Sequence, residues 1–395
     1  MLFFEILIGL SFLKMVVCIV LYLFNKPSDP PGGVGDEGGL SPSADILLPM
    51  YNEEKVVVST IHNLLNIAGP GTSVIVVDDG STDKSYEVVQ AHFSGHPQVR
   101  LVHQPNGGKS SALNRAMGVS ESDIIVCIDA DTMVKPDAME RILPYFRDEK
   151  VAAVAGYIKV GNRVNLLTDM QYAEYLTIQG LDRILFGPLN GILVVPGALG
   201  AFRRTAVKAV GGFTAEALAE DCDITLRLLC EGYTIKNAAS AFSFTEAPAT
   251  AKMFCKQRVR WTVGLLQGLL KHHRRLMGQP NKALAWLVLP FTWLYRVILP
   301  LFTPFADLYF VYACLFLHQY DCWKYYGLFL LTEALPAGVI LLWRGERMNW
   351  VKGTALQLLY RQLGLITYLS IVLRWCKGNL YGWSKIPREG SVKMD

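Results

Sequence analysis

The sequence predicts an α/β domain built on a mostly parallel sheet and joined to an α-helical transmembrane region. Short, almost wholly apolar runs alternate with helical stretches from residue 44 onward, which is typical of a parallel sheet covered by helices on both faces. Acidic and polar residues follow several of these runs, at the edge where such sheets bind ligands. Two apolar blocks, at residues 3–24 and from about 283 to 375, flank this region and predict membrane helices.

The composition agrees with this division. The 395-residue chain is 51% hydrophobic and 18% charged, whereas a soluble domain would carry about 25% charged residues. The net charge of +4 is too small to indicate nucleic acid, and no basic stripe with interleaved aromatic residues occurs. We therefore expect no nucleic-acid partner. The basic run Lys271–Arg275 suits anionic lipid headgroups, although a solvated helix face would have the same composition.

Residues 1–26 are predicted to be an uncleaved transmembrane anchor. A secretory signal has nearly this length and apolarity, but no basic stretch precedes the apolar run and no A-x-A site follows it, while Glu5 and Lys14 interrupt it. Residues 27–43 are rich in Pro, Gly and Ser and predict a flexible linker. The eight cysteines form no CxxC pattern, so neither a zinc site nor a disulfide framework is expected, and unpaired thiols in the middle domain suit a reducing cytosol.

The catalytic domain is expected to cover residues 44–248. Its elements follow from runs of apolar residues and from turn and capping residues between them. Strands are predicted at residues 44–49, 73–78, 99–103 and 124–128, and helices at about 53–67, after Thr82 or Asp83, at about 109–119 and from 219 to about 231.

Two acidic motifs follow strands. Asp129 and Asp131 are alternate residues of an extended segment and share one side of it. Two like charges so close are costly unless they share a cation, so the pair predicts a divalent ion held together with substrate phosphates. Asp79, in the Asp-Asp-Gly-Ser turn, is predicted to accept a hydrogen bond from a nucleotide. An ordinary surface turn or helix cap is the alternative for each motif.

Two further motifs open helices. Lys109 follows an Asn-Gly-Gly turn, and backbone amides beside an ammonium group predict an anion site. The spacing is not that of a Walker A loop, which excludes an ATPase. Asp221, preceded by Glu220, is predicted to be the general base for an acceptor hydroxyl. A stabilising charge at the start of a helix is the alternative, and the spacing does not separate the two.

The run from Gln257 to Trp261, Gln-Arg-Val-Arg-Trp, lies in a basic amphipathic stretch just before the second apolar block. Residues 249–282 are therefore expected to lie at the membrane interface. An arginine fork here suits a diphosphate, and the tryptophan offers a flat face for a sugar ring. The alternative is a common arginine–tryptophan interfacial anchor.

In this order, the motifs resemble those of glycosyltransferase family 2, and specifically its membrane-embedded processive synthases, which make cellulose, hyaluronan, chitin and poly-N-acetylglucosamine. The matching segments are residues 49–54, 77–83, 108–109, 129–131, 197–204, 220–221 and 257–261. The segment at 197–204, Gly-Ala-Leu-Gly-Ala-Phe-Arg-Arg, looks most like bacterial poly-N-acetylglucosamine synthases.

The resemblance implies a GT-A fold, a UDP-sugar donor and a Mg²⁺ or Mn²⁺ ion. It implies a donor site made of Pro49, Tyr51, Glu53, Asp79, Lys109, Asp129, Asp131, Gln257, Arg258 and Arg260. It likewise implies an acceptor site of Gly197, Glu220 and Trp261, metal binding by Asp129 and Asp131, and Asp221 as the base. Two departures from the family stand out. Ala219 replaces its usual threonine, and a single amino-terminal span is found where several relatives have two.

Residues 283–376 are predicted to form transmembrane helices, and residues 377–395 a basic tail. Three prolines at positions 290, 300 and 304 interrupt the block from Ala283 to about Leu317, which predicts either one tilted span plus an interfacial segment or two short spans. Clearer spans cover residues 325–343 and 354–375.

The positive charges of the carboxyl-terminal region do not settle its topology. Lys377, Lys385 and Arg388 place the tail in the cytoplasm, yet the basic loop from Arg344 to Lys352 suggests the same side, with one span between them. We expect a cytoplasmic tail after four crossings.

Four charged residues fall within the apolar segments. A charge at the centre of a bilayer costs about 2.5–3.5 kcal/mol on insertion scales. Such side chains either extend to the headgroups or line a polar path for a hydroxyl-rich chain, and both remain open. The residues are Lys14, Arg296, Glu333 and Arg361.

Together these features predict an integral membrane protein with a cytoplasmic catalytic domain. We expect a processive inverting hexosyltransferase that polymerises a polysaccharide from a UDP-sugar, with UDP-N-acetylglucosamine as the best candidate, and moves it across the membrane. Expected partners are the donor, a growing polysaccharide or lipid acceptor, membrane lipids and an accessory export subunit. The alternatives are a non-processive transferase acting on a membrane lipid and an inactive, transferase-like scaffold.

Overall fold

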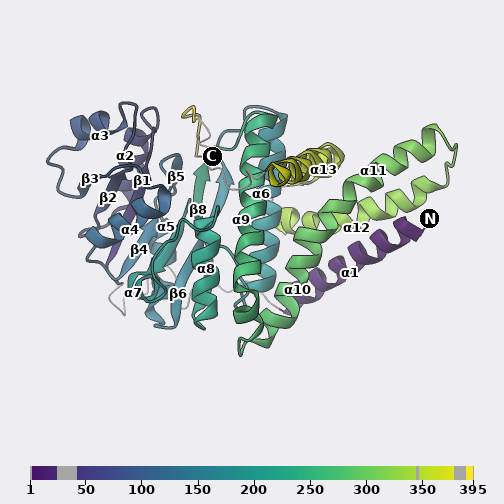
Figure 1. The fold of residues 1–395 in the computed structure, drawn as a ribbon, viewed down its shortest axis with the longest axis horizontal. Coiled ribbons are helices and arrows are strands. Elements are labelled where there is room, and N and C mark those ends of the chain that lie inside the picture. The colour runs from purple at the N-terminus through teal and green to yellow at the C-terminus, as the bar shows by residue number, and fades with distance from the viewer. Residues whose placement is uncertain (1, 25–41, 344–346, 378–387, 395) are drawn as a thin grey trace.

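A computed structural model describes residues 2–24, 42–343, 347–377 and 388–394. Of the predicted linker at 27–43, only residues 42–43 are described. Lys385 of the tail lies outside the described residues. The described chain forms a sheet domain, two long helices beside it, and a group of apolar helices that projects away (Figure 1).

The sheet has eight strands in the order β3-β2-β1-β4-β7-β6-β8-β5. β1, β2, β3 and β4 pair in parallel, as do β6 and β8, whereas β7 runs antiparallel to β4 and β6, and β5 to β8. The mostly parallel sheet predicted from the sequence is confirmed. The strands are β1 (Ala44–Met50), β2 (Val74–Asp78), β3 (Val99–His103), β4 (Ile124–Cys127), β5 (Thr132–Val134), β6 (Val151–Val160), β7 (Gly200–Arg203) and β8 (Thr234–Thr245).

Both faces of this sheet are buried. Along β1, Leu47 belongs to one apolar cluster while Ile46 and Leu48 belong to another, because successive side chains of a strand point to opposite faces. This explains why the strands are apolar at almost every position. The shorter helices of the domain are α2 (Val57–Ile67), α3 (Ser85–Phe93), α4 (Lys109–Val119), α5 (Ala138–Ile142), α7 (Arg204–Ala209) and α8 (Glu220–Cys230).

The helix boundaries follow local turn chemistry. α4 covers the predicted residues 109–119 and is preceded by Gly108, whose φ of +82° favours glycine. α2 begins at Val57 rather than at Glu53. The reason is Asn52, whose left-handed φ of +54° ends β1 in a turn, and its side chain then accepts hydrogen bonds from the backbone of Thr82 and Asp83.

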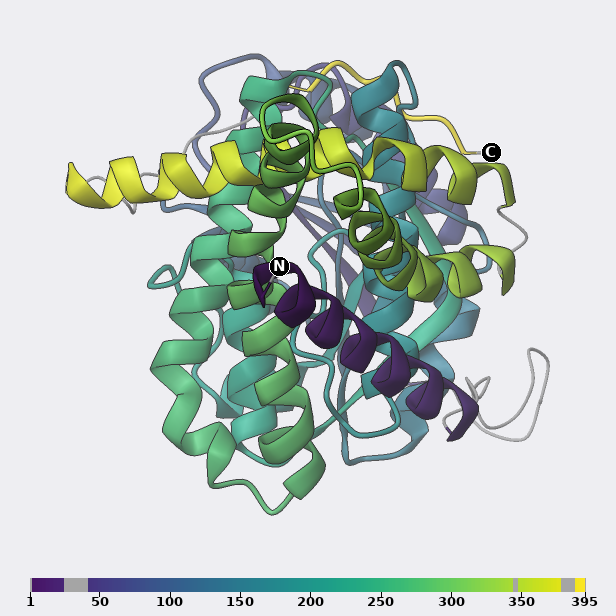
Figure 2. The ribbon, with the colours of Figure 1, turned by 90° about the vertical axis from the view of Figure 1, so that its right-hand side faces the viewer.

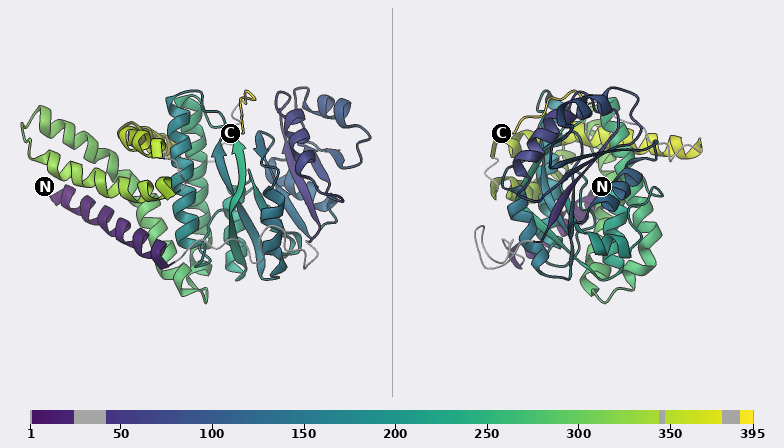
Figure 3. Two further views of the ribbon diagram at one scale, coloured as in Figure 1. Left: turned by 180° about the vertical axis from the view of Figure 1, so that it is seen from behind. Right: turned by 90° about the vertical axis from the view of Figure 1, so that its left-hand side faces the viewer.

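The helices α6 (Leu166–Phe186) and α9 (Ala251–Met277) stand between the sheet and the projecting helices, as the view from behind also shows (Figure 3). α9 matches the amphipathic stretch predicted from the sequence. It is the element that connects the sheet domain to the apolar part of the chain.

The proline-containing block forms one helical run. Two π-helical segments, η2 (Leu284–Val288) and η3 (Trp293–Ile298), alternate with α10 (Leu289–Thr292) and α11 (Leu299–Leu315). Pro290 and Pro300 fall at the first positions of α10 and α11, where the missing N–H does least harm. The run therefore continues through the prolines, and the two short spans considered above do not form.

Among the described residues, two helices are long and apolar enough to cross a membrane, Phe4–Phe24 and Leu284–Leu315. The first lies in α1 (Leu2–Phe24), which packs with α11 and α12 (Cys322–Trp343). α13 (Arg347–Cys376) lies across α9 and also contacts α6, α11 and α12 (Figure 2). In the described chain, three helical segments follow α9, so the four crossings expected after it are not what the structure provides. Residues 344–346 lie outside the described residues, and residues 347–352 of the predicted loop begin α13.

The four charges predicted to lie within apolar segments are all ion-paired with residues of other helices. The pairs are Lys14 with Glu333 (3.1 Å), Arg296 with Asp182 (2.6 Å) and Arg361 with Asp307 (2.5 Å). Pairing between helices satisfies these charges inside the bundle. Contact with the headgroups and a polar lining both stay predictions for these charges.

Candidate active site

A pocket of about 170 Å³ opens at the carboxyl ends of β1, β2 and β4. It brings together nine of the ten residues predicted for the donor site. These are Pro49, Tyr51, Glu53, Asp79, Lys109, Asp129, Asp131, Gln257 and Arg260. The pocket lies where ligands bind in parallel sheets, and its lining also includes Lys256, Arg374 and Arg388.

Lys109 connects two acidic segments of the pocket. Its Nζ lies 2.6 Å from Asp129 Oδ1 and 2.8 Å from Glu220 Oε1. Burial favours the neutral amine, but the two carboxylates outweigh it and raise the pKa of Lys109, so the lysine stays charged. A Cβ at Gly197 would lie 2.6 Å from this Nζ. Gly197 therefore contributes to the site by leaving room for the lysine.

Asp79 holds the loop before α4 in place. Its carboxylate accepts hydrogen bonds from the backbone of Gly107 at 2.9 Å and Gly108 at 2.7 Å, and from Gln104 Nε2 at 2.7 Å. The two backbone amides predicted as an anion site are thus already bound by a carboxylate. Asn106, Gly108 and Lys109 of that motif line the pocket, and the contact of Asp79 with uridine stays a prediction.

Asp131 has a carboxylate oxygen that lacks a hydrogen bond among the described residues. The side chain is 6% exposed, and Oδ1 accepts from Thr132 and Thr245 at 3.2 and 3.4 Å. Oδ2 lies 2.7 Å from Arg388 Nε, close enough for an ion pair, but has no hydrogen-bond partner. A buried carboxylate oxygen that lacks a hydrogen bond can accept a cation.

The carboxyl-terminal segment returns to the pocket. Arg388 donates to the backbone oxygen of Glu246 at 2.7 Å, and the backbone N–H groups of Glu389 and Gly390 donate to the Glu246 carboxylate at 2.9 and 3.0 Å. Further along, the backbone of Lys393 bonds to Gly161 of the sheet domain. From the sequence, Arg388 was expected only as a charge of the tail, because no motif connects so distant a residue with Asp131.

Asp221 occupies the first turn of α8 beside Glu220. Burial and the neighbouring Glu220 carboxylate raise the pKa of Asp221 to about 6, against the opposing charges of Lys109 and Arg260. A carboxylate with such a pKa accepts a proton more readily than an ordinary aspartate, which suits a general base. Asp221 does not line the pocket. Glu220 does not line it either, but its carboxylate is ion-paired with Lys109, which does.

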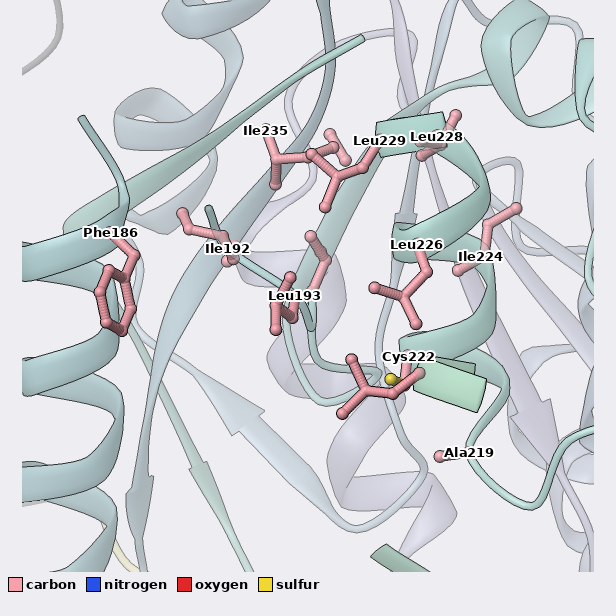
Figure 4. Close-up of a cluster of buried hydrophobic side chains, with 14 of the residues drawn as sticks. Phe186, Ile192, Leu193, Ala219, Cys222, Ile224, Leu226, Leu228, Leu229 and Ile235 are labelled. Carbon is pink, nitrogen blue, oxygen red and sulfur yellow. The ribbon is translucent and has the colours of Figure 1, made fainter. Parts of the chain in front are cut away.

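The position of α8 is set by packing along its length. Cys222, Leu226 and Leu229 enter the apolar cluster that also contains Leu193 and Phe186 (Figure 4). At its start, a Cβ on Gly264 of α9 would lie 2.4 Å from the Cβ of Ala219. The alanine that departs from the family's threonine thus packs against a glycine of α9, which joins the two helices closely.

The two arginines of the motif on α9 point in different directions. Gln257 and Arg260 are three residues apart on one side of the helix and line the pocket. The Arg260 guanidinium makes no short ion pair within the described residues, although its charge acts on Asp129, Glu220 and Asp221. It is therefore available to an anion. Arg258 instead pairs with Glu174 of α6, to which Tyr360 of α13 also donates.

Trp261 lies beside Arg258. The Arg258 guanidinium carbon is 4.4 Å from the Trp261 ring centroid, and the ring of Tyr175 is 5.9 Å from that of Trp261. Trp261 is 36% exposed. Arg258 was predicted to bind the donor, but its side chain lies outside the pocket and contacts Trp261, the predicted acceptor residue.

Residues 45–211 match glycosyl transferase family 2. The chain is 30% identical over 261 residues to the poly-beta-1,6-N-acetyl-D-glucosamine synthase of Staphylococcus aureus (strain COL), a match covering 64% of this chain and 63% of that protein. The synthase of Staphylococcus epidermidis is 29% identical over 259 residues, with 64% and 62% covered. The chain therefore spans somewhat less than two thirds of these relatives.

The fold has a counterpart among solved structures. A mannosyltransferase from Pyrobaculum calidifontis, in complex with GDP-Man and Mn²⁺, superposes with a TM-score of 0.63 at 20% identity, covering 95% of this chain and 99% of that one. The expected GT-A fold is confirmed. The fold and the family match agree with each other, since residues 45–211, less than half of the chain, match glycosyl transferase family 2 and the described chain has the GT-A fold.

Proposed function

We propose that the protein is a processive inverting synthase that extends a polysaccharide from UDP-N-acetylglucosamine at a membrane. The observation that carries this proposal is the pocket, which brings the Asp129 and Asp131 carboxylates together with the Arg260 guanidinium. Carboxylates suit a divalent ion, and arginine suits a diphosphate. The proposed product and sugar are taken from the relatives, whose names describe synthesis of poly-N-acetylglucosamine.

The pocket residues fit a divalent ion that is bound together with the donor. Asp131 Oδ2 is buried without a hydrogen bond, but Arg388 lies 2.7 Å from it and Lys109 lies 2.6 Å from Asp129, so an ion would compete with these two side chains. The described chain contains no cluster of three or more His, Cys, Asp or Glu. Asp129 and Asp131 would thus hold the ion, with donor phosphates and water as the other ligands. Such an ion neutralises diphosphate charge, and the solved mannosyltransferase contains Mn²⁺. Mg²⁺ and Mn²⁺ both suit this site.

The transfer step is a single displacement. The acceptor hydroxyl oxygen bonds to the anomeric carbon as the bond from that carbon to the diphosphate oxygen breaks, which inverts the configuration. The hydroxyl proton passes to the Asp221 carboxylate, whose raised pKa suits this role. The departing UDP carries the electron pair, and Arg260 and Lys109 stabilise its negative charge.

The apolar helices support a membrane location. Large apolar side chains remain exposed along α1 and α11, among them Leu23 at 67% and Phe305 at 49%. A continuous apolar surface of this kind needs a partner, and lipid suits helices of this length. We place the sheet domain in the cytoplasm, where UDP-sugars are available. An accessory export subunit stays a prediction.

The proposal is tested with purified protein and a panel of UDP-sugars. UDP release and product length are measured in the same reactions. We expect UDP-N-acetylglucosamine to yield long polymer. Single transfer to a lipid would support the non-processive alternative, and the absence of UDP release with every donor would support the inactive scaffold.

We expect Trp261→Ala to separate hydrolysis from elongation. Its ring is exposed beside the site and offers a surface for the terminal sugar of the growing chain, while Arg260 still binds the diphosphate. UDP release should persist as long product disappears. Trp286, which is 69% exposed, provides the control, because Trp286→Ala removes an aromatic side chain from the apolar part of the protein instead. Parallel loss of hydrolysis and elongation would contradict the acceptor role and favour an interfacial anchor.

We expect Arg258→Ala to resemble Trp261→Ala rather than Arg260→Ala. Arg258 lies against the Trp261 ring and outside the pocket, so its loss should shorten the product and leave the KM for the donor within about threefold. Arg260→Ala should raise that KM about tenfold or more, because it removes a charge-assisted contact. Donor KM and polymer length for both variants decide the point. Equal increases in the donor KM of the two variants would indicate that Arg258 binds the donor.

A further inference from the structure

The turn between α11 and α12 holds two cysteines that the proposed reaction does not use. Cys314 is the second-last residue of α11 and Cys322 the first residue of α12. Their Sγ atoms lie 3.7 Å apart. Both thiols are reduced in this structure.

The two cysteines continue a seam of contacts between the helices. Tyr326 donates to Asp307 Oδ1 at 2.8 Å, and its ring stacks on Phe310 with centroids 4.1 Å apart. Cys314 follows Asp307 by seven residues and Cys322 precedes Tyr326 by four, so each cysteine lies on the face that already contacts the other helix. The register of α11 against α12 thus brings the thiols together.

The turn lies at the end of the molecule farthest from the sheet domain, near the amino-terminal end of α1 (Figure 1). Its side chains are those of a membrane–water boundary. Asp321 and Lys324 form an exposed ion pair at 3.0 Å, which needs water. Tyr320 and Trp323 are 63% and 61% exposed, as in the aromatic belts at membrane surfaces.

We propose that Cys314 and Cys322 form a disulfide that links α11 to α12 on the side of the membrane opposite the catalytic pocket. This disulfide depends on the proposed function only for the orientation of the protein in the membrane. If the pocket meets UDP-sugars in the reducing cytoplasm, the turn faces an extracytoplasmic compartment where disulfides persist. The link fixes the helix pair that carries Asp307, the partner of Arg361.

The chemistry is thiol–disulfide exchange. An external disulfide accepts two electrons, its two sulfurs leave as thiols, and the two cysteine sulfurs lose their protons and form one bond of about 2.05 Å. The sulfur atoms have to approach by less than about 2 Å. Residues 316–321 form a turn, and the approach of the two sulfurs has to preserve the backbone hydrogen bonds that Phe316, Gln319 and Cys322 donate there.

The test uses the full-length protein in membranes. Free thiols are blocked under denaturing conditions, the sample is reduced, and newly released thiols are counted by the mass added with a polyethylene-glycol maleimide. We expect two released thiols in the wild type, none in Cys314→Ser or Cys322→Ser, and still two in the control Cys376→Ser, whose thiol is exposed at the end of α13. No released thiol in the wild type would overturn the disulfide.

A second arm tests the side of the membrane. Gln319→Cys places a thiol at the exposed turn, in a chain with Cys314→Ser, Cys322→Ser and Cys376→Ser. A membrane-impermeant maleimide should label it from outside in intact cells, and labelling only in inverted vesicles would overturn the proposal. UDP release is measured on the same membranes and should persist in Cys314→Ser. A disulfide in a protein that releases no UDP would contradict the proposed function alone.

Discussion

Asp221→Asn is expected to bind UDP normally and to lower sugar transfer by about 10²-fold or more. Asp221 lies outside the pocket that holds the donor, so its loss should remove the proton acceptor without removing a donor contact. UDP affinity and the transfer rate are measured on the same folded preparation. Glu216→Gln is the control, because Glu216 is an acidic residue near α8 that is 73% exposed and pairs with Lys271.

The pH dependence gives an independent check on this role. The carboxylate form of Asp221 accepts the proton, and its pKa is raised to about 6. The deprotonated fraction therefore falls as the pH drops through about 6, and kcat/KM should fall with it, about tenfold for each pH unit below that value. In Asp221→Asn this acidic limb should disappear. Near-normal transfer in the variant, or an unchanged limb, would leave Asp221 as a residue that only stabilises the start of α8.

The second large effect is expected from Asp131→Asn, which should lower turnover by at least about 10²-fold and weaken donor binding only when a divalent ion is present. The variant keeps the size of the side chain but removes the charge of a buried carboxylate, one of whose oxygens lacks a hydrogen bond. Donor affinity is titrated with and without Mg²⁺ or Mn²⁺, and a chelator is added to the wild type in parallel.

Asp137→Asn is the matched control for this experiment. Asp137 follows Asp131 by six residues, is 40% exposed and pairs with Arg141 away from the pocket. It should leave both the donor affinity and its metal dependence unchanged. If neither the chelator nor Asp131→Asn alters UDP release, the metal site is assigned to the wrong residues.

Much of the sheet domain could be predicted because its signals are local. β3 and α4 occupy the predicted residues 99–103 and 109–119, since apolar periodicity and a preceding glycine decide these elements within a few residues of chain. The same locality placed Asp79, Asp129 and Asp131 at strand ends. Parallel pairing of β1 with β2 and β4 then brings those ends to one edge, and the pocket residues with them.

The structure differs from the predictions at the prolines, and it gives the charges within the apolar helices partners that were not predicted. Pro290 and Pro300 suggested breaks, but the π-helical segments before them let the helix continue. The charge at Lys14 suggested a lipid or channel contact, yet its partner Glu333 lies on a helix distant in sequence. Local rules describe the cost of a proline or a charge, but they do not show which neighbour offsets it.

The sequence by itself determined the fold class, the family motifs and the edge of the sheet where they gather, because periodicity and strand order act over short stretches of chain. Only the tertiary structure decided the direction of Arg258, which turns to Glu174 on another helix, and the return of Arg388 to Asp131. These contacts join residues far apart in the chain. They depend on how helices and the carboxyl-terminal segment pack around the sheet, and no spacing rule in the sequence records that packing.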